Sequence, residues 1–495
     1  MKLYWHQYKY FPYEKELGLR ELKELAGVEP IELNSNYITV NASVSQDILN
    51  KLVYFSHVEN GSGILKTAQK QLEEANENTR STKRQITRYS SHGLHEYKGK
   101  FNPQVVKALL NILCPNEHAK VLDPFCGSGT TLVESVHAEC NSVGFDINPL
   151  AVFISNAKLK SIKADIKHLK NISEQIINEY RKTELPEIIT PRITYLKSWF
   201  PESIYTEIER LRLTSLQLAG ELADIFLVIV SNNLREYSFQ EPADLRIRRR
   251  ISPFPEEPFI EVIKRSFNKY LTELEYTMSL VYKPNVEGNA ILHDIRQTQN
   301  IANYESYFDV AITSPPYSTA LPYIDTQRLS LVWLGLIEAV QINPLEEELI
   351  GSREFKKVTF NRWLTRMQGN QDGIPNSMSA FCNGLQDSLL PTDGFRRQAV
   401  PSLLYRYFSD MQKMFSNVLY MMKNDGLFAL VVGHNQTTIG GIKHRIDTPT
   451  LLAQVAEHIG WTVSEVTRLQ AYHRYSLHSS NAINEESLII LKKQI

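Results

Sequence analysis

Two short stretches of the chain carry residue types that could hold a small ligand and a reactive amine. The first, Val121–Glu134, reads VLDPFCGSGTTLVE: an apolar start, then Asp123 and Pro124, a turn on Gly127–Ser128–Gly129, and a polar helix start. Glycines let a ligand approach the backbone, and the free N–H groups of a helix start face that ligand. The GxGxxG spacing of dinucleotide binders is absent, and no Walker lysine follows the glycines. The stretch therefore predicts a ligand site between a strand and a helix.

The second stretch, Thr313–Tyr317, reads TSPPY and follows the apolar run Phe308–Ile312, which predicts a strand. An exocyclic amine is a poor nucleophile because its lone pair is delocalised into the ring. The hydroxyl of Ser314 and the carbonyl of Pro315 offer two acceptors that can hold the N–H groups of such an amine. Tyr317 adds an aromatic face on which an extruded base can stack.

Together the two stretches resemble the DNA amino-methyltransferases, which bind S-adenosylmethionine (SAM) with a DPFxGSGTT loop and catalyse with a (D/N/S)PP(Y/F/W) loop. The resemblance implies that SAM is the cofactor. It assigns catalysis to Ser314, Pro315, Pro316 and Tyr317. It assigns the first part of the cofactor site to Asp123, Pro124, Phe125, Gly127, Ser128, Gly129, Thr130 and Thr131. The serine of the catalytic loop is more typical of members that methylate cytosine N4 than of those that methylate adenine N6.

The segment that precedes the first stretch also resembles this family. His95–Pro103 reads HEYKGKFNP and matches the HxYxxKFxP pattern that closes over the methionine end of the cofactor. The resemblance implies cofactor contacts from His95, Lys100 and Phe101, with Lys100 or backbone amides meeting the SAM carboxylate.

Two acidic residues at predicted strand ends complete the expected cofactor site. Residues 144–149 read GFDINP and match the family pattern GxDxNP, in which the acid, here Asp146, can accept both ribose hydroxyls. Asp294 resembles the acid of the (G)DxR segment that meets the adenine of SAM. His293 stands where the family usually has glycine.

A cytosine-C5 methyltransferase is excluded, because it would need a cysteine nucleophile in the catalytic loop and no cysteine lies between Cys140 and Cys382. Three alternatives to cytosine N4 stay open: adenine N6 methylation by the same residues, methylation of an RNA amine, and a non-catalytic DNA-binding subunit of a defence complex. The resemblance implies double-stranded DNA as the substrate and a restriction–modification or defence setting. A cognate restriction endonuclease or other defence proteins would be the partners there.

These motifs must be positioned by a Rossmann-like α/β core. We predict this core over residues 89–155 and 288–495, with the SAM loop before the catalytic loop. Helical spacing dominates residues 156–287, which predicts a helical insertion that the core does not need. Residues 1–88 are expected to form a small N-terminal α+β module and a linker.

Two arginine-rich segments are candidates for contacting DNA. The run Leu245–Arg250, inside the helical insertion, has few amide side chains and suits the phosphate backbone. The segment 337–401, which we expect to be rich in turns, combines arginine with asparagine and glutamine, the mix that pairs with guanine and adenine edges. It is the candidate target-recognition region. The candidate DNA-binding residues are Arg246, Arg248, Arg249, Arg250, Arg353, Arg362 and Arg366.

The composition is that of an ordinary soluble protein, with 495 residues, 42% hydrophobic residues and a formal net charge of −1. Bulk charge therefore argues neither for nor against nucleic acid. The four cysteines have no CxxC spacing, which indicates free thiols in a reducing compartment and no metal site. The first residues lack a signal-peptide core and no run approaches the length of a membrane span, so we expect a cytoplasmic protein.

Overall fold

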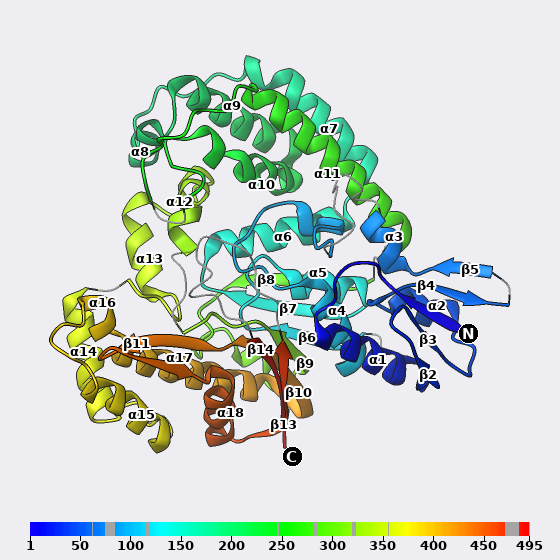
Figure 1. Cartoon of the computed structure of the whole chain (residues 1–495). Helices are drawn as coiled ribbons and strands as arrows, with labels where there is room; N and C mark the ends of the chain where they lie inside the picture. The colour runs from blue at the N-terminus through cyan, green and yellow to red at the C-terminus, as the bar shows by residue number, and fades with distance from the viewer. Residues whose placement is uncertain are drawn as a thin grey trace.

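The computed structural model describes residues 1–61, 63–74, 85–114, 116, 118–244, 247–281, 285–318, 323–354, 356–470 and 485–494. A seven-stranded sheet lies in the middle of the molecule, with a layer of helices on one side and a small N-terminal sheet at one end (Figure 1).

The central sheet has the strand order β13-β14-β10-β9-β6-β7-β8. Five neighbouring strands run parallel, and β14 runs antiparallel to both of its neighbours. The strands are β6 (Lys120–Asp123), β7 (Asn141–Asp146), β8 (Gly288–Leu292), β9 (Phe308–Thr313), β10 (Met422–Gly433), β13 (Trp461–Gln470) and β14 (Glu485–Lys493). From β6 the chain adds β7 and β8 on one side and then β9 on the other. A crevice forms at such a reversal, beside the carboxyl ends of the strands. This order confirms the predicted Rossmann-like α/β core.

Helices cover both faces of this sheet, because parallel strands buried on two sides need apolar partners above and below. Val121, Val310 and Val431 point into one apolar cluster with α4 and the N-terminal module. Phe428 and Leu430 point into a second cluster with α17 and α18. The helices of the core are α4 (Pro103–Leu113), α5 (Thr130–His137), α6 (Pro149–Lys163), α17 (Val400–Met421) and α18 (Thr448–Ile459).

The N-terminal module is a five-stranded sheet with the order β2-β3-β1-β4-β5 and three helices, in agreement with the predicted α+β class. Alternating side chains such as Leu3 and Trp5 of β1 fill its core, because successive residues of a strand face opposite sides. The elements are β1 (Lys2–Trp5), α1 (Pro12–Ala26), β2 (Glu32–Leu33), β3 (Tyr37–Thr39), α2 (Gln46–Lys51), β4 (Phe55–Asn60), β5 (Gly63–Lys66) and α3 (Ala68–Glu74).

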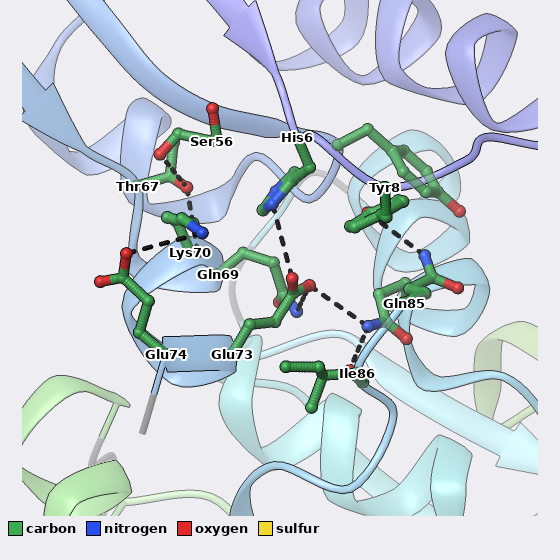
Figure 2. A network of polar contacts seen from close by, with 12 residues as sticks. His6, Tyr8, Ser56, Thr67, Gln69, Lys70, Glu73, Glu74, Gln85 and Ile86 are labelled. Carbon is green, nitrogen blue, oxygen red and sulfur yellow. Dashed lines mark hydrogen bonds and ion pairs between the residues drawn. The ribbon is translucent and has the colours of Figure 1, made fainter. Parts of the chain in front are cut away.

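A buried polar network joins this module to the core (Figure 2). Glu73 of α3 accepts hydrogen bonds from Gln69 and from Gln104 of α4, at 3.0 and 3.3 Å, and its other oxygen lies 3.4 Å from Nδ1 of His6. Lys107 of α4 donates to Gln69 at 3.1 Å. Since buried polar groups are costly when unpaired, this shared network holds the module in one position against α4.

The predicted helical insertion is a layer of helices at the top of Figure 1. It contains α7 (Ile166–Glu179), α8 (Pro191–Trp199), α9 (Glu202–Ala219), α10 (Ala223–Asn233) and α11 (Phe259–Val281). The predicted boundary at residue 156 falls inside α6, which packs on β8 and belongs to the core. Against expectation, Glu202–Asn233 is long and apolar enough to cross a membrane by length and composition. Its residues form α9 and α10, and many of their apolar side chains are buried in this layer.

The segment 337–401 is helical where described, so the expected turn-rich loop is a wrong prediction. Its glycines and prolines lie mostly between short helices, which are α13 (Ile342–Glu348), α14 (Lys357–Gln368), α15 (Asn376–Asp387) and α16 (Phe395–Gln398). In Figure 1, α12 (Tyr323–Trp333) and α13 descend from the helical layer toward these helices. A two-stranded hairpin of β11 (Asn435–Ile439) and β12 (Ile442–Ile446), absent from the prediction, follows β10.

Candidate functional site

The loop after β6 forms the tight turn that its glycines predict. Gly127 and Gly129 have φ angles of 49° and 78°, in the left-handed region, and α5 begins at the next residue, Thr130. A side chain at Gly129 would also place its Cβ 2.8 Å from Oγ of Ser155. Glycine is therefore required at Gly129 by backbone conformation and by space.

Two side chains of α6 donate hydrogen bonds to carbonyls of this turn. Oγ of Ser155 donates to the carbonyl of Gly127, and Nζ of Lys158 donates to the carbonyl of Ser128, both at 2.8 Å. Lys158 is fully buried, and burial lowers its pKa well below the ordinary lysine value. The sequence gave no sign of this support, because a lysine in a helix is normally exposed.

Asp146 ends β7 and faces the turn across the crevice. Its carboxylate accepts hydrogen bonds from the backbone N–H of Gly127 at 2.9 Å and of Asn148 at 2.8 Å. Burial raises the pKa of Asp146 to about 6. The carboxylate is thus fixed in place beside the glycine turn, and it is ionised at neutral pH.

The catalytic loop predicted by the sequence lies at the end of the adjacent strand, β9. Thr313, the last residue of β9, donates from Oγ1 to Oδ1 of Asp123 at 2.6 Å. Tyr317 donates from its hydroxyl to Oε1 of Glu486 in β14 at 3.1 Å. The loop is therefore attached on one side to the strand of the glycine turn and on the other side to β14.

One cavity joins these parts. All four predicted catalytic residues line it, together with five predicted cofactor residues: Pro124, Phe125, Gly127, Asp146 and Asp294. Residues that the sequence analysis did not assign also line it, among them Tyr97, Lys98, Gly99, Asn148, Arg296 and Ile350. Tyr97 to Gly99 belong to the segment that resembles HxYxxKFxP, and Arg296 is the arginine of the segment that resembles (G)DxR, whereas Ile350 had no motif to mark it.

His293 and Asp294, which follow β8 in the chain, also line the cavity. The Asp294 carboxylate accepts from the Arg296 guanidinium at 2.7 to 3.1 Å. Burial alone would raise the pKa of Asp294, but the hydrogen bonds and the charge of Arg296 outweigh it and the pKa is lowered. His293 is buried, and its ring packs edge-on against Phe145 at 5.4 Å. The histidine thus fills space where the family usually has glycine.

The remaining predicted cofactor residues do not line this cavity, although the structure describes all of them: His95, Lys100, Phe101, Asp123, Ser128, Gly129, Thr130 and Thr131. Lys100 donates instead to the carbonyls of Thr87 and His92, at 2.8 and 3.3 Å, and burial lowers its pKa to about 7. The prediction that Lys100 meets a carboxylate of the cofactor is therefore not supported by its position. His95 is buried, with Nε2 3.3 Å from Oγ of Ser231 in α10. Lys100 and His95 thus bind other parts of the chain and do not face the cavity.

Several of the candidate DNA-binding arginines have structural partners. Arg249 lies 4.3 Å from the ring of Trp199 and donates to the Ser198 carbonyl, and Arg250 donates to the Glu236 carbonyl. Arg366 pairs with Asp372. Arg248, Arg249, Arg353 and Arg362 are exposed, and Arg246 lies outside the described residues. Of the two exposed arginines in the run 247–250, Arg249 is held by Trp199 and the Ser198 carbonyl.

A family model and several curated relatives match parts of this chain. The N6/N4 methyltransferase family model, described as DNA methylase, matches residues 32–157. The type II methyltransferase M.MvaI of Kocuria varians is 27% identical over 326 residues, which are 60% of this chain and 68% of M.MvaI. M.BsoBI of Geobacillus stearothermophilus, also a type II methyltransferase, is 26% identical over 273 residues, 50% of this chain and 53% of M.BsoBI.

Among solved structures, TrmN from Thermus thermophilus matches with a TM-score of 0.27 and 10% identity, over 80% of this chain and 50% of TrmN. A TM-score of this size does not establish a common fold. The fold assignment therefore rests on the strand order of the central sheet.

Proposed function

We propose that the chain is a SAM-dependent DNA methyltransferase of the amino-methyltransferase family and that it methylates the exocyclic amine of a flipped base, preferably cytosine N4. The observation that carries the proposal is the shared cavity. Gly127 of the glycine turn, Asp146 and the loop Ser314 to Tyr317 all line it. A cofactor held by the first two and a base held by the loop would therefore share one cavity.

The residues present fit SAM. The Gly127 backbone and the Asp146 carboxylate stand together at 2.9 Å, where the carboxylate can accept the ribose hydroxyls of a nucleoside. Phe125 and Ile295 supply apolar surface, and Asp294 supplies an acceptor for an adenine amine. When bound, SAM supplies an electrophilic methyl group on its sulfonium sulfur.

The catalytic loop would activate the amine by hydrogen bonding. Ser314 Oγ and the Pro315 carbonyl would accept its two N–H groups, which draws the nitrogen lone pair out of the ring plane and toward the methyl group. The ring of Tyr317 would stack on the base. Its bond to Glu486 holds that ring against β14, so the base has a fixed surface to stack on.

The preference for cytosine N4 rests on Ser314, since serine at this position is more typical of N4 enzymes than aspartate or asparagine. We also propose that the substrate is double-stranded DNA in the cytoplasm, within a restriction–modification system that includes a cognate endonuclease. The type II names of the relatives support this setting.

The direct test is transfer of a radiolabelled methyl group from SAM to duplex DNA of random sequence, with RNA duplexes and single strands as parallel substrates. We expect label in duplex DNA. Label in RNA alone would mean that the substrate is RNA and not DNA. SAM binding without transfer to any nucleic acid would favour a non-catalytic subunit.

A further inference from the structure

The hairpin β11–β12 is fixed at both ends. At its base, Asn435 donates from Nδ2 to Oγ of Ser318, the residue that follows the catalytic loop. At its tip, the N–H of Gly440 donates to Oδ2 of Asp393 at 2.9 Å. A Cβ at Gly440 would lie only 2.3 Å from the carbonyl oxygen of Ser388, so the docked tip requires glycine. The hairpin therefore spans from the catalytic loop to the α14–α16 lobe, residues 357–398 (Figure 1).

The register of the hairpin separates its side chains into two faces, because residues directly opposite in an antiparallel pair share a face. Ile439 and Ile446 are buried in the cluster that contains α17 and α18. The other face carries two cross-strand pairs, Gln436 with Arg445 and Thr438 with Lys443. Lys443 and Arg445 are exposed. One face thus anchors the hairpin through Ile439 and Ile446, although Ile442 at its tip is exposed. The other face carries only polar and cationic side chains, of which Gln436 and Thr438 are half-buried.

These four outward residues are those that read base edges. A two-stranded ribbon fits the major groove of B-form DNA, where arginine or lysine pairs with guanine, glutamine pairs with adenine, and threonine contacts the thymine methyl group. Residues two apart on a strand are separated by about 6.8 Å. That is about the rise of two base pairs, at roughly 3.4 Å each. The two cross-strand pairs are therefore spaced to address base pairs two apart.

We propose that the outward face of the hairpin, Gln436, Thr438, Lys443 and Arg445, reads the target sequence in the major groove, with the Gln436–Arg445 pair next to the methylated base. The inference rests on the proposed function. It assigns the α14–α16 lobe a supporting role, since Asp393 holds the hairpin tip.

Arg445→Ala, Arg445→Lys and Gln436→Ala test the proposal, with Arg362→Ala as a variant of the supporting lobe. Arg445→Lys is decisive because it keeps the positive charge and loses the bidentate hydrogen-bond geometry of the guanidinium group. Methylated positions would be mapped by sequencing, and kcat/KM compared on the cognate site and on sites changed at one base. SAM affinity and the melting temperature would show that each variant is folded.

We expect both Arg445 variants to lose about 5- to 150-fold of discrimination at one base pair, and Gln436→Ala to lose it at a neighbouring one, with SAM affinity unchanged. Arg362→Ala should leave the methylated sequence as it is. If Arg445→Lys keeps wild-type specificity while Arg445→Ala weakens binding to all sequences alike, Arg445 contacts phosphate and the proposal is overturned. The proposal is also overturned if Arg362→Ala changes the methylated sequence and no substitution of Arg445 or Gln436 does.

These outcomes are distinct from a failure of the proposed function. In that case the wild-type protein would bind SAM and methylate no DNA. If only the hairpin inference fails, the wild type still methylates a defined sequence, and all hairpin variants methylate that same sequence.

Discussion

The hydroxyl of Thr313 donates a hydrogen bond to the carboxylate of Asp123 over 2.6 Å, and both side chains are buried. Thr313 ends β9 and leads into the catalytic loop, whereas Asp123 ends β6 and leads into the glycine turn. The bond therefore fixes the distance between the two halves of the site, which neither motif sets alone.

Thr313→Val should reduce catalysis more than cofactor binding. The substitution keeps the shape and removes the donor, which leaves one oxygen of the buried Asp123 with fewer partners. We expect a loss of about 1–3 kcal/mol in the free energy of unfolding. We also expect a fall in kcat, since the loop is no longer held. Thr313→Ser, which keeps the hydroxyl, is the control. Wild-type stability and kcat in the valine variant would show that the bond has no such role.

Ser314→Ala should lower the methylation rate far more than SAM affinity, because Ser314 would contact the base and not the cofactor. Tyr317→Ala should do the same by removing stacking, which is worth about 1–3 kcal/mol in single-strand binding sites. Tyr317→Phe keeps the ring and removes the hydroxyl that donates to Glu486, so its loss should be smaller. Single-turnover methylation and calorimetric SAM titration measure the two quantities separately. Near-normal turnover in both alanine variants would remove the loop from catalysis.

SAM affinity should fall as the pH is lowered through about 6. Burial raises the pKa of Asp146 to about 6, and only the ionised carboxylate accepts hydrogen bonds through both oxygens. Below that pH the affinity should approach a tenfold loss per pH unit. Between about pH 4 and pH 6, the Asp146 carboxyl group is protonated in the folded state. In the unfolded state, where its pKa is about 3.9, the same group is ionised. Ionisation of Asp146 therefore costs stability as the pH rises from about 4 to 6, and the cost persists above pH 6.

Calorimetry between pH 5 and 8 checks this dependence. Asp146→Asn is the control, with weak affinity that no longer depends on this group. If the wild-type affinity stays constant over that range, the ribose role of Asp146 is wrong.

Much of the site follows from local patterns in the sequence. Asp146 and Gly127 were predicted because each lies in a short motif at a strand end, where parallel topology brings carboxyl ends together. The bonds of Lys100 to the carbonyls of Thr87 and His92 were not foreseen, because no motif marks those two carbonyls as its partners. The bond between Tyr317 and Glu486 spans 169 residues.

The helices of 337–401 and the hairpin were missed for related reasons. Gly384 lies inside α15, and Gly369 follows α14 directly, so a glycine-rich composition favoured turns. Tertiary packing of Met378 and Leu385 against α17 overrides that preference. The alternation in β11–β12 is only five residues long on each strand, too short to distinguish from a loop.

Arg248 and Arg249 are both exposed but differ in their contacts, which makes single substitutions informative. Arg248→Ala should leave the melting temperature unchanged, weaken binding to all DNA sequences alike, and reduce the salt slope by about 1. Arg249→Ala should lower the melting temperature, since it removes the contact with Trp199 and the bond to the Ser198 carbonyl. Fluorescence anisotropy at several salt concentrations measures the first effect. An unchanged salt slope for Arg248→Ala would place the phosphate contacts elsewhere.

The central claim is methyl transfer to cytosine N4 in DNA. The most direct measurement is nucleoside mass spectrometry of DNA from cells that express the protein, beside cells that express Ser314→Ala. We expect N4-methylcytosine with the wild type and its loss with the variant. N6-methyladenine in its place, or neither modified base, would contradict it.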